Sequence, residues 1–310
     1  MNVRGQGDVE PRSNVRSVVV DFIDRHLGII FLAPALVLVL GTLVYPIASN
    51  IYYSLTDKHL YLPGVSWVGF DNYVEIFTDP AFYKALGNTL IYTVAVVLVQ
   101  LIFGTASALL LNANIRGKQF FRLLVIIPYA FPSVTVALLW KWILHGLFGG
   151  LNGMLLWMAV IEQPISWFSN ATAAMPMAVL VSVWFGYPLF TLTILAGLQS
   201  IPKEHYEVAR IEGASAWNTF WHVTFPSILR VVGVIVILRV VWVFNTFDLL
   251  FVLTGGGPAG ATETLPLYVY RMGWSLGLIG QTAAVAIILF LMLFAVIAIL
   301  LKYFDIEGNR

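Results

Sequence analysis

The chain has 310 residues, of which 59% are hydrophobic and only 11% are charged. A typical soluble domain is about 45–50% apolar and about 25% charged, so this chain has too few charges to cover a surface that faces water. Intrinsic disorder is excluded as well, because it combines low hydrophobicity with high charge. The net charge of +1 leaves no basic footprint for nucleic acid. The absence of cysteine excludes disulfides and cysteine-ligated metals. An integral membrane protein remains.

Six predominantly apolar stretches along the chain are long enough to cross a bilayer, which takes about 20 residues of helix. They are Leu27–Ser49, Ala85–Leu111, Leu123–Leu144, Ala174–Leu198, Ile228–Leu253 and Leu276–Leu301. None alternates strictly between apolar and polar residues as a barrel strand does. The sequence therefore predicts an all-α membrane protein with six transmembrane helices. A seventh stretch, Leu147–Ile161, contains three glycines and is short, which favours an interfacial or re-entrant segment.

The distribution of basic residues predicts the orientation. The N-terminal segment, the second-to-third and fourth-to-fifth connections and the tail together hold twelve lysines and arginines, whereas the opposite connections hold four. The positive side faces the cytoplasm, so both termini are expected there. We predict a cytoplasmic segment over residues 1–26, a six-helix domain over 27–303 with a cytoplasmic loop at 199–227, and a tail over 304–310. The apolar spacing within Val15–Ile23 predicts an interfacial helix in the first segment.

Motifs for nucleotide or metal chemistry are missing from the sequence. The nearest approach to a phosphate-binding loop, Arg116–Gln119, has no serine or threonine after its lysine. There is no dinucleotide-binding glycine fingerprint, no His-Glu-x-x-His pair and no Gly-x-Ser-x-Gly elbow. We therefore expect no enzymatic activity, no metal site and no cofactor on this chain. Energy taken from a nucleotide would have to come from a partner chain.

Ionisable residues inside the spans are the usual pointers to function in a membrane protein. Lys141 lies near the outer end of the third span and is expected to reach the interface. Arg239 lies near the middle of the fifth span, and Asp248 follows nine residues later, on the opposite face of a continuous helix. Two isolated charges make a poor proton relay, so a secondary carrier is the disfavoured alternative. An intramembrane enzyme or scaffold lacks any supporting motif.

The connection between the fourth and fifth spans is the most patterned polar segment. Pro202 and Gly213 occupy positions typical of the start and end of a helix, which predicts a helix over Lys203–Glu212. A second short helix is predicted over Ser215–Thr224, running to Pro226 and into the fifth span. Two helices joined at a glycine would form a rigid protrusion into the cytoplasm.

The residues of this connection resemble the signature loop of binding-protein-dependent ABC importer permeases, in which a Glu-Ala-Ala motif is followed by a glycine and then by Ile-x-Leu-Pro. The matching residues are Glu207, Ala209, Gly213, Ala214, Phe220 and Pro226, while Val208, Glu212, Val223 and Phe225 are substitutions of similar character. The resemblance extends over most of the chain, through Phe31–Ala35, Tyr45–Ile47, Val68–Tyr73, Asn88–Thr89, Thr254–Pro258, Thr264–Leu265 and Tyr268–Tyr270. They are similar to the first of two non-identical permeases in maltose, trehalose and glycerol-phosphate importers.

The resemblance implies the type I importer permease fold and a multi-pass location in the inner membrane of a bacterium or archaeon. It implies a heterodimer with a second permease, two ATPase subunits that bind ATP and Mg, and an extracytoplasmic solute-binding protein. It also implies that the loop docks on the ATPase through Glu207, Ala209, Glu212, Gly213, Ala214, Phe220 and Pro226.

Candidate substrate contacts lie in the fourth and fifth spans. Pro188 frees a backbone carbonyl, which is tolerated at membrane depth only beside protein or a water-filled cavity. The residues predicted to line the substrate pathway are Phe185, Gly186, Tyr187, Trp242, Asn245, Phe247 and Asp248. Aromatic faces with a few hydrogen-bonding groups suit a sugar, whereas the alternative is that these residues only pack helices. The sequence also allows the alternative that the transported solute is a glycerol phosphoester or another non-sugar compound. Arg239 would serve a phosphate or sulfonate, pair with the sister permease or anchor to backbone carbonyls.

Overall fold

A computed structural model describes residues 28–29 and 31–304 and divides the chain into two compact units that meet between Tyr53 and Ser54. The regular secondary structure of this described part is helical, apart from one isolated antiparallel bridge between Thr56 and Trp67. The predicted interfacial helix Val15–Ile23 lies outside the described residues. Residues 1–26 as a whole and the predicted tail beyond Phe304 also lie outside the described residues.

The first predicted span is a helix over Phe31–Ser54, and all of it but its last residue belongs to the first unit. This helix contains a π-helical turn, η1 (Leu40–Val44), and continues as α2 (Tyr45–Ser54). The wide turn lies directly before Pro46, which has no N–H to donate to the preceding turn. The helix runs past the predicted end at Ser49 and ends at Ser54.

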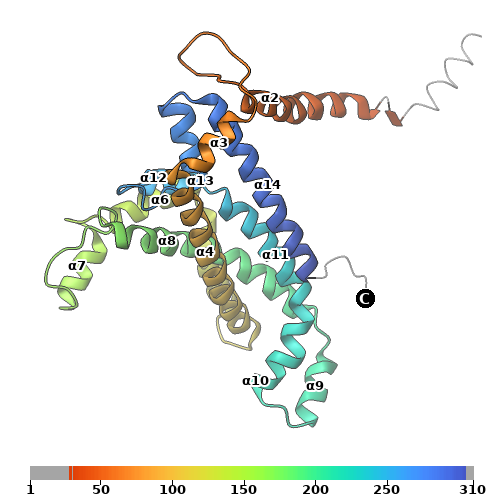
Figure 1. The fold of residues 1–310 in the computed structure, drawn as a ribbon. Helices are drawn as coiled ribbons and strands as arrows, with labels where there is room; N and C mark the ends of the chain where they lie inside the picture. Colours follow the sequence, from red (N-terminus) through yellow and green to blue (C-terminus); the bar gives the residue numbers. More distant parts are fainter. Residues whose placement is uncertain (1–27, 30, 305–310) are drawn as a thin grey trace, which may run out of the picture. The chain divides into compact units, whose positions relative to one another are not determined.

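The second unit contains the remaining helices, most of which are labelled in Figure 1. They are α3 (Asp71–Thr78), α4 (Pro80–Asn112), α5 (Lys118–Ile126), η2 (Ile127–Ala130), α6 (Ser133–Ile143), α7 (Gly150–Trp157), α8 (Ala171–Gln199), α9 (Lys203–Ile211), α10 (Ala216–Thr219), η3 (Phe220–Thr224), α11 (Phe225–Phe244), α12 (Asp248–Leu253), α13 (Leu265–Tyr270), η4 (Arg271–Ser275) and α14 (Ile279–Phe304). Five helices of the described chain are long and apolar enough to cross a membrane, and one bent pair makes six. This agrees with the six predicted spans.

Local sequence signals set the starts of the two longest helices. The carboxylate of Asp79 accepts the backbone N–H of Ala81 at 2.8 Å, and Pro80 occupies the first turn of α4. The side chain of Asn170 accepts the N–H of Thr172 at 2.9 Å at the start of α8. Such caps satisfy donors that have no partner inside the helix.

The third predicted span is not one straight helix. Its two parts, Lys118–Ala130 and Ser133–Ile143, meet at an angle of 97°. Pro128 and Pro132 explain the bend, because each lacks a backbone N–H and the second forces Phe131 into an extended conformation. The prediction of a span over Leu123–Leu144 was therefore correct in its apolar composition, but it did not include this break.

The fifth predicted span also breaks. A continuous helix made of α10, η3 and α11 ends at Phe244, and α12 begins at Asp248 after three residues outside the helix. The second predicted loop helix thus joins the span without interruption. The expectation that Asp248 lies on the same helix as Arg239, on its opposite face, is wrong because the helix is interrupted between Phe244 and Asp248.

The core of the second unit forms where α4 packs along α8, with α11 against both. The helices approach closely at Gly104, since a Cβ there would overlap the side chain of Phe190. α8 remains helical through Pro176 and Pro188. The rigid contact between α4 and α8 provides the frame against which the broken spans lie.

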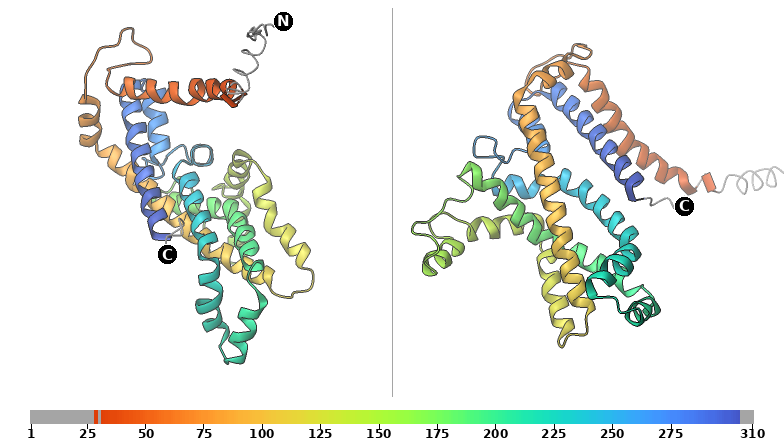
Figure 2. Two further views of the ribbon diagram at one scale, coloured as in Figure 1. Left: turned by 90° about the vertical axis from the view of Figure 1, so that its right-hand side faces the viewer. Right: turned by 60° about the horizontal axis from the view of Figure 1, so that its bottom comes forward.

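Connections predicted to share the cytoplasmic side lie at one end of the second unit, as Figures 1 and 2 show for the segment after α4 and for α9 and α10. α3 lies at the other end. Leu109, near the end of α4, lines the same cavity as Tyr206 of α9, which fixes this proximity.

The seventh apolar stretch, Leu147–Ile161, contains the eight-residue helix α7. This helix is too short to cross a membrane. Its segment is held by Asn152, whose side-chain amide donates to the carbonyls of Gly146 and Ile165 and accepts from the indole N–H of Trp167 at 3.0 Å. The segment is therefore an ordered element outside the spans.

Candidate functional site

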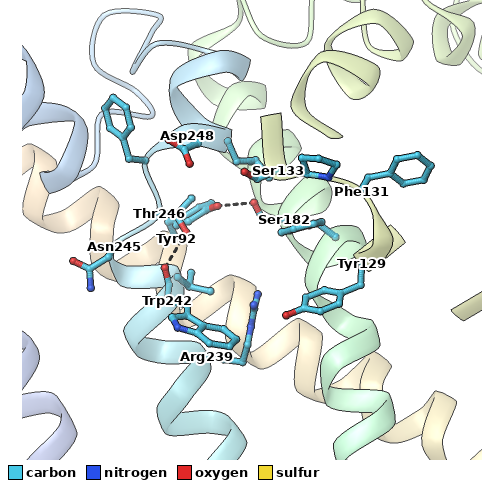
Figure 3. A pocket seen from close by; sticks show the side chains of 15 residues that line it. Tyr92, Tyr129, Phe131, Ser133, Ser182, Arg239, Trp242, Asn245, Thr246 and Asp248 are labelled. Carbon is cyan, nitrogen blue, oxygen red and sulfur yellow. Dashed lines mark hydrogen bonds between the residues drawn. The ribbon is translucent and has the colours of Figure 1, made fainter. Parts of the chain in front are cut away.

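A cavity of about 570 Å³ lies where the two broken spans meet α4 and α8 (Figure 3). One wall is the break before α6, and another is the break between α11 and α12. Irregular backbone at membrane depth is stable only where protein or a water-filled cavity satisfies its polar groups. The volume lies within the range of about 300–1,000 Å³ that holds small ligands.

The wall from the third span and α8 combines aromatic and hydroxyl groups. Tyr129 stacks on Phe185 with ring centroids 5.9 Å apart and planes at 30°. Ser133 at the start of α6 and Ser182 of α8 add hydroxyl groups to the same cavity. This wall offers a flat apolar face beside hydrogen-bonding groups.

The wall from the fifth span is formed by residues that replace missing helical hydrogen bonds. The amide of Asn245 donates to the carbonyl of Val241 at 2.8 Å, and the hydroxyl of Thr246 donates to the carbonyl of Trp242 at 3.2 Å. The last carbonyls of a helix lack backbone partners, so these side chains stabilise the break. They also bring Phe247 and Asp248 to the cavity.

Five of the seven predicted pathway residues line this cavity, namely Phe185, Trp242, Asn245, Phe247 and Asp248. Tyr187 does not, and instead lines a separate apolar pocket with Leu110 and Phe121. Gly186 is buried beneath the cavity wall. Successive residues of a helix point about 100° apart, so Phe185, Gly186 and Tyr187 cannot all face one cavity.

Arg239 reaches the cavity from α11 and is held by a buried hydrogen-bond chain. Its Nε–H donates to Oε1 of Gln100 at 3.0 Å, and Nε2 of Gln100 donates to the carbonyl of Ser182 at 2.6 Å. Gly186 makes room for this arrangement, because a Cβ there would collide with the side chains of both Gln100 and Arg239. The guanidinium also lies 5.9 Å from the ring centroid of Trp242.

Sequence reasoning missed several polar residues of this site. Gln100 is completely buried, and the hydroxyl of Tyr92 lies 2.5 Å from that of Ser182. Tyr129 also lines the cavity. The available signal was the presence of hydrogen-bonding side chains within long apolar spans, where each needs a partner.

Lys141 is bonded within the protein. Its ammonium donates to the carbonyl of Val252 at 2.9 Å. The contact joins α6 to the end of α12, the two segments that follow the helix breaks. The sequence predicted the position of this side chain near a span end but not its partner.

The predicted loop forms two short helices at one end of the second unit. Helix α9 ends in a Schellman motif, in which the N–H of Gly213 donates to the carbonyl of Arg210 and the N–H of Ala214 to that of Ala209. Gly213 has a φ of 74°, a conformation that glycine adopts without strain. The glycine therefore sets the angle between the helices, as its position in the sequence suggested.

The predicted docking residues are distributed around this turn. Glu207 and Glu212 are exposed on α9 and at its end, while Ala209 is buried. Ala214 and Phe220 line a second cavity of about 670 Å³ between the two helices. Pro226 is exposed at the second position of α11. The hydroxyls of Tyr206 and Thr224, 3.3 Å apart, join the helices.

Comparison with known proteins gives relatives along nearly the whole chain. Residues 100–305 match the family described as "Binding-protein-dependent transport system inner membrane component". The inner membrane ABC transporter permease protein YcjO of Escherichia coli (strain K12) is 34% identical over 291 residues, which cover 93% of this chain and 97% of YcjO. The trehalose/maltose transport system permease protein MalF of Thermococcus litoralis is 32% identical over 279 residues, covering 90% and 94%.

Another relative is the sulfoquinovosyl glycerol transport system permease protein SmoG of Agrobacterium fabrum, 33% identical over 284 residues that cover 91% of each chain. Among solved structures, a chain of a bacterial ABC transporter involved in the import of the acidic polysaccharide alginate has the same fold. Its TM-score is 0.79 at 21% identity, over 94% of this chain and 99% of that chain. Since the family match and these relatives extend over most of the sequence, the chain belongs to the family of binding-protein-dependent transport system inner membrane components.

Proposed function

We propose that the chain carries a sugar or sugar-like solute through the inner membrane, together with a second homologous permease, two ATPase subunits and an extracytoplasmic solute-binding protein. As a member of its family it is a multi-pass inner-membrane permease of an ABC transporter, a transport subunit rather than an enzyme. ATP and Mg would bind to the partner ATPases. The proposal concerns the solute, the partners and the residues that serve them.

The observation that carries the proposal is the cavity at the two helix breaks. It presents the stacked rings of Tyr129 and Phe185, the indole of Trp242 and several hydroxyl and amide groups. A sugar has apolar ring faces and a hydroxyl edge, so aromatic surfaces with hydrogen-bonding groups complement it. The names of MalF and SmoG, which refer to transport of trehalose and maltose and of sulfoquinovosyl glycerol, point to the same class of solute.

The loop between α8 and α11 is the proposed contact with the ATPases. Exposed Val208, Ile211 and Trp217 give its outer surface an apolar character, and Glu207 adds a charge. The Schellman turn at Gly213 and the contact between Tyr206 and Thr224 make the two helices one rigid body. A rigid protrusion transmits movement of a docked ATPase to α11, with which α10 is continuous.

The test is to purify the complex of this chain with its partner subunits, reconstitute it in liposomes and measure ATP hydrolysis. The cognate binding protein, loaded in turn with members of a panel of neutral and acidic sugars and polyols, should raise the ATPase rate only with its own solute. The unloaded binding protein is the control. Extraction in mild detergent that yields no associated ATPase, or stimulation by non-sugar solutes alone, would contradict the proposal.

A secondary carrier remains the alternative to be tested. Uptake of the stimulating solute into liposomes should require ATP and should continue after an uncoupler has collapsed the proton gradient. Uptake that follows the gradient and ignores ATP would instead support the carrier. The described spans supply only Arg239 and Asp248 at the cavity as ionisable groups other than tyrosine, which is few for a proton relay.

A further inference from the structure

The guanidinium of Arg239 is buried at the cavity without a counter-charge in the described part of the chain. Its side chain is 6% exposed. Only its Nε–H has a hydrogen-bond partner among the described residues, the neutral amide of Gln100. One terminal nitrogen, Nη2, lies against Gly186, and the residue lines the cavity. Figure 3 shows the hydroxyl of Tyr129 pointing toward the same guanidinium.

Carboxylates elsewhere in the described chain do not neutralise Arg239. The ion pair found there joins Arg271 to Glu263, outside the cavity. Asp248 is the acidic residue that lines the cavity, but it forms no ion pair with Arg239. In Figure 3 the two side chains lie at opposite ends of the site, separated by the hydroxyls of Tyr92 and Ser182.

We propose that the cavity accepts a solute that carries an oxyanion, either a carboxylate, a sulfonate or a phosphate monoester, and that Arg239 binds this group. This inference rests on the proposed sugar transport and narrows it to acidic sugars. A charge within a membrane span is costly and is retained where it serves a pathway or a ligand. Guanidinium presents paired N–H donors that match the two oxygens of such an anion.

The surroundings of Arg239 hold it in a fixed orientation for that role. Gln100 fixes the Nε edge, the absence of a Cβ at Gly186 accommodates one terminal nitrogen, and Trp242 covers one face of the guanidinium. These contacts hold the guanidinium at the cavity before a ligand arrives. A site organised in this way loses little conformational entropy when the anion binds.

Arg239 and Asp248 together specify the solute further. An anion at Arg239 leaves the other end of the solute beside Asp248, whose carboxylate accepts hydrogen bonds from hydroxyl groups. The stacked rings of Tyr129 and Phe185 lie along the same cavity. The arrangement fits a sugar with its acidic group at one end and free hydroxyls at the other.

The experiment measures binding to the detergent-purified complex without the binding protein, so that only the permease cavity is tested. The probes are glucose, glucuronate, 6-deoxy-6-sulfoglucose and glycerol 3-phosphate, titrated by saturation-transfer NMR. We expect the two anionic sugars to bind at least tenfold more tightly than glucose, since a hydrogen bond to a charged group contributes about 1.5–3 kcal/mol, a factor of about 10–150.

Three variants connect this preference to Arg239. Arg239→Gln should remove the preference, Arg239→Lys should keep part of it, and Arg230→Gln should leave it intact. Arg230 is the matched control because it lies on the same helix, is exposed and is not part of the cavity. Thermal unfolding of each variant complex verifies that binding is compared between folded proteins.

The outcomes separate this inference from the proposed function. Equal binding of glucose and the anionic sugars, no binding of any probe, or a preference that survives in Arg239→Gln would overturn the inference. Loss of complex assembly in Arg239→Gln alone would also overturn it, because the anion would then belong to a neighbouring subunit. Binding of glycerol 3-phosphate that depends on Arg239, with no sugar bound, would support the anion site and refute sugar transport.

Discussion

Replacing Gly186 with alanine tests the packing on which the cavity depends. Gly186 lies inside α8, where alanine is the better helix former by about 1 kcal/mol. Propensity alone therefore predicts a more stable helix. The structure predicts the opposite, because the new Cβ would occupy space held by the side chains of Gln100 and Arg239.

The magnitude follows from the contacts that must give way. Moving Arg239 sacrifices its 3.0 Å hydrogen bond to Gln100, and a bond with a charged donor contributes about 1.5–3 kcal/mol. Overpacking a core adds about 1–3 kcal/mol. After subtracting the helix propensity gain, we expect Gly186→Ala to lower the free energy of unfolding by about 1.5–5 kcal/mol.

The assay compares Gly186→Ala with Gly197→Ala, a matched change in the same helix. A Cβ at Gly197 would lie 3.4 Å from Val231, an ordinary contact, so this variant should be neutral or slightly stabilised. Thermal unfolding of the purified complex and ATP-dependent solute uptake are measured for both. Equal stability and equal uptake in the two variants would refute the reasoning. So would additive effects of Gly186→Ala and Gln100→Ala, because residues in one network should be coupled.

Substitutions at three further positions test other parts of the structure. Gly213→Leu should retain membrane insertion but abolish ATPase stimulation by the loaded binding protein, because a φ of 74° costs a branched residue about 1–2 kcal/mol. Gly213→Asn should keep part of the stimulation. Full coupling in the leucine variant would contradict the role of the loop. Asn245→Leu should reduce uptake about tenfold by leaving the carbonyl of Val241 without its donor, which uptake at the wild-type rate would disprove. Asn152→Ala should lower the free energy of unfolding by about 2–4 kcal/mol, measured by thermal unfolding, unless the α7 segment is held by other contacts.

The number and positions of the spans could be predicted because the thickness of a bilayer sets the length of an apolar helix. The breaks within them could not be placed in the same way. Pro128 and Pro132 signalled the bend in the third span, but the apolar run around them was continuous. The fifth span has no proline or glycine at its break. Its break depends on hydrogen bonds from Asn245 and Thr246, which become clear only from coordinates.

The loop was the easiest part of the site to predict, since its geometry is local. A glycine after a short helix encodes a Schellman turn, and Gly213 forms one. The cavity was harder because its contacts join distant segments. Gln100 lies 139 residues from Arg239 in the sequence, and nothing local indicates their hydrogen bond.

The cavity and the two helix breaks depend on each other. Backbone groups freed at Phe131–Ser133 and Asn245–Phe247 would be too costly in lipid. Each break is tolerated because it faces the cavity, and the residues at the two breaks form a large part of the cavity lining. Lys141 reinforces the arrangement by joining α6 to the end of α12. Apolar residues thus place the chain in the membrane, while a few prolines and hydrogen-bonding side chains decide where a solute meets it.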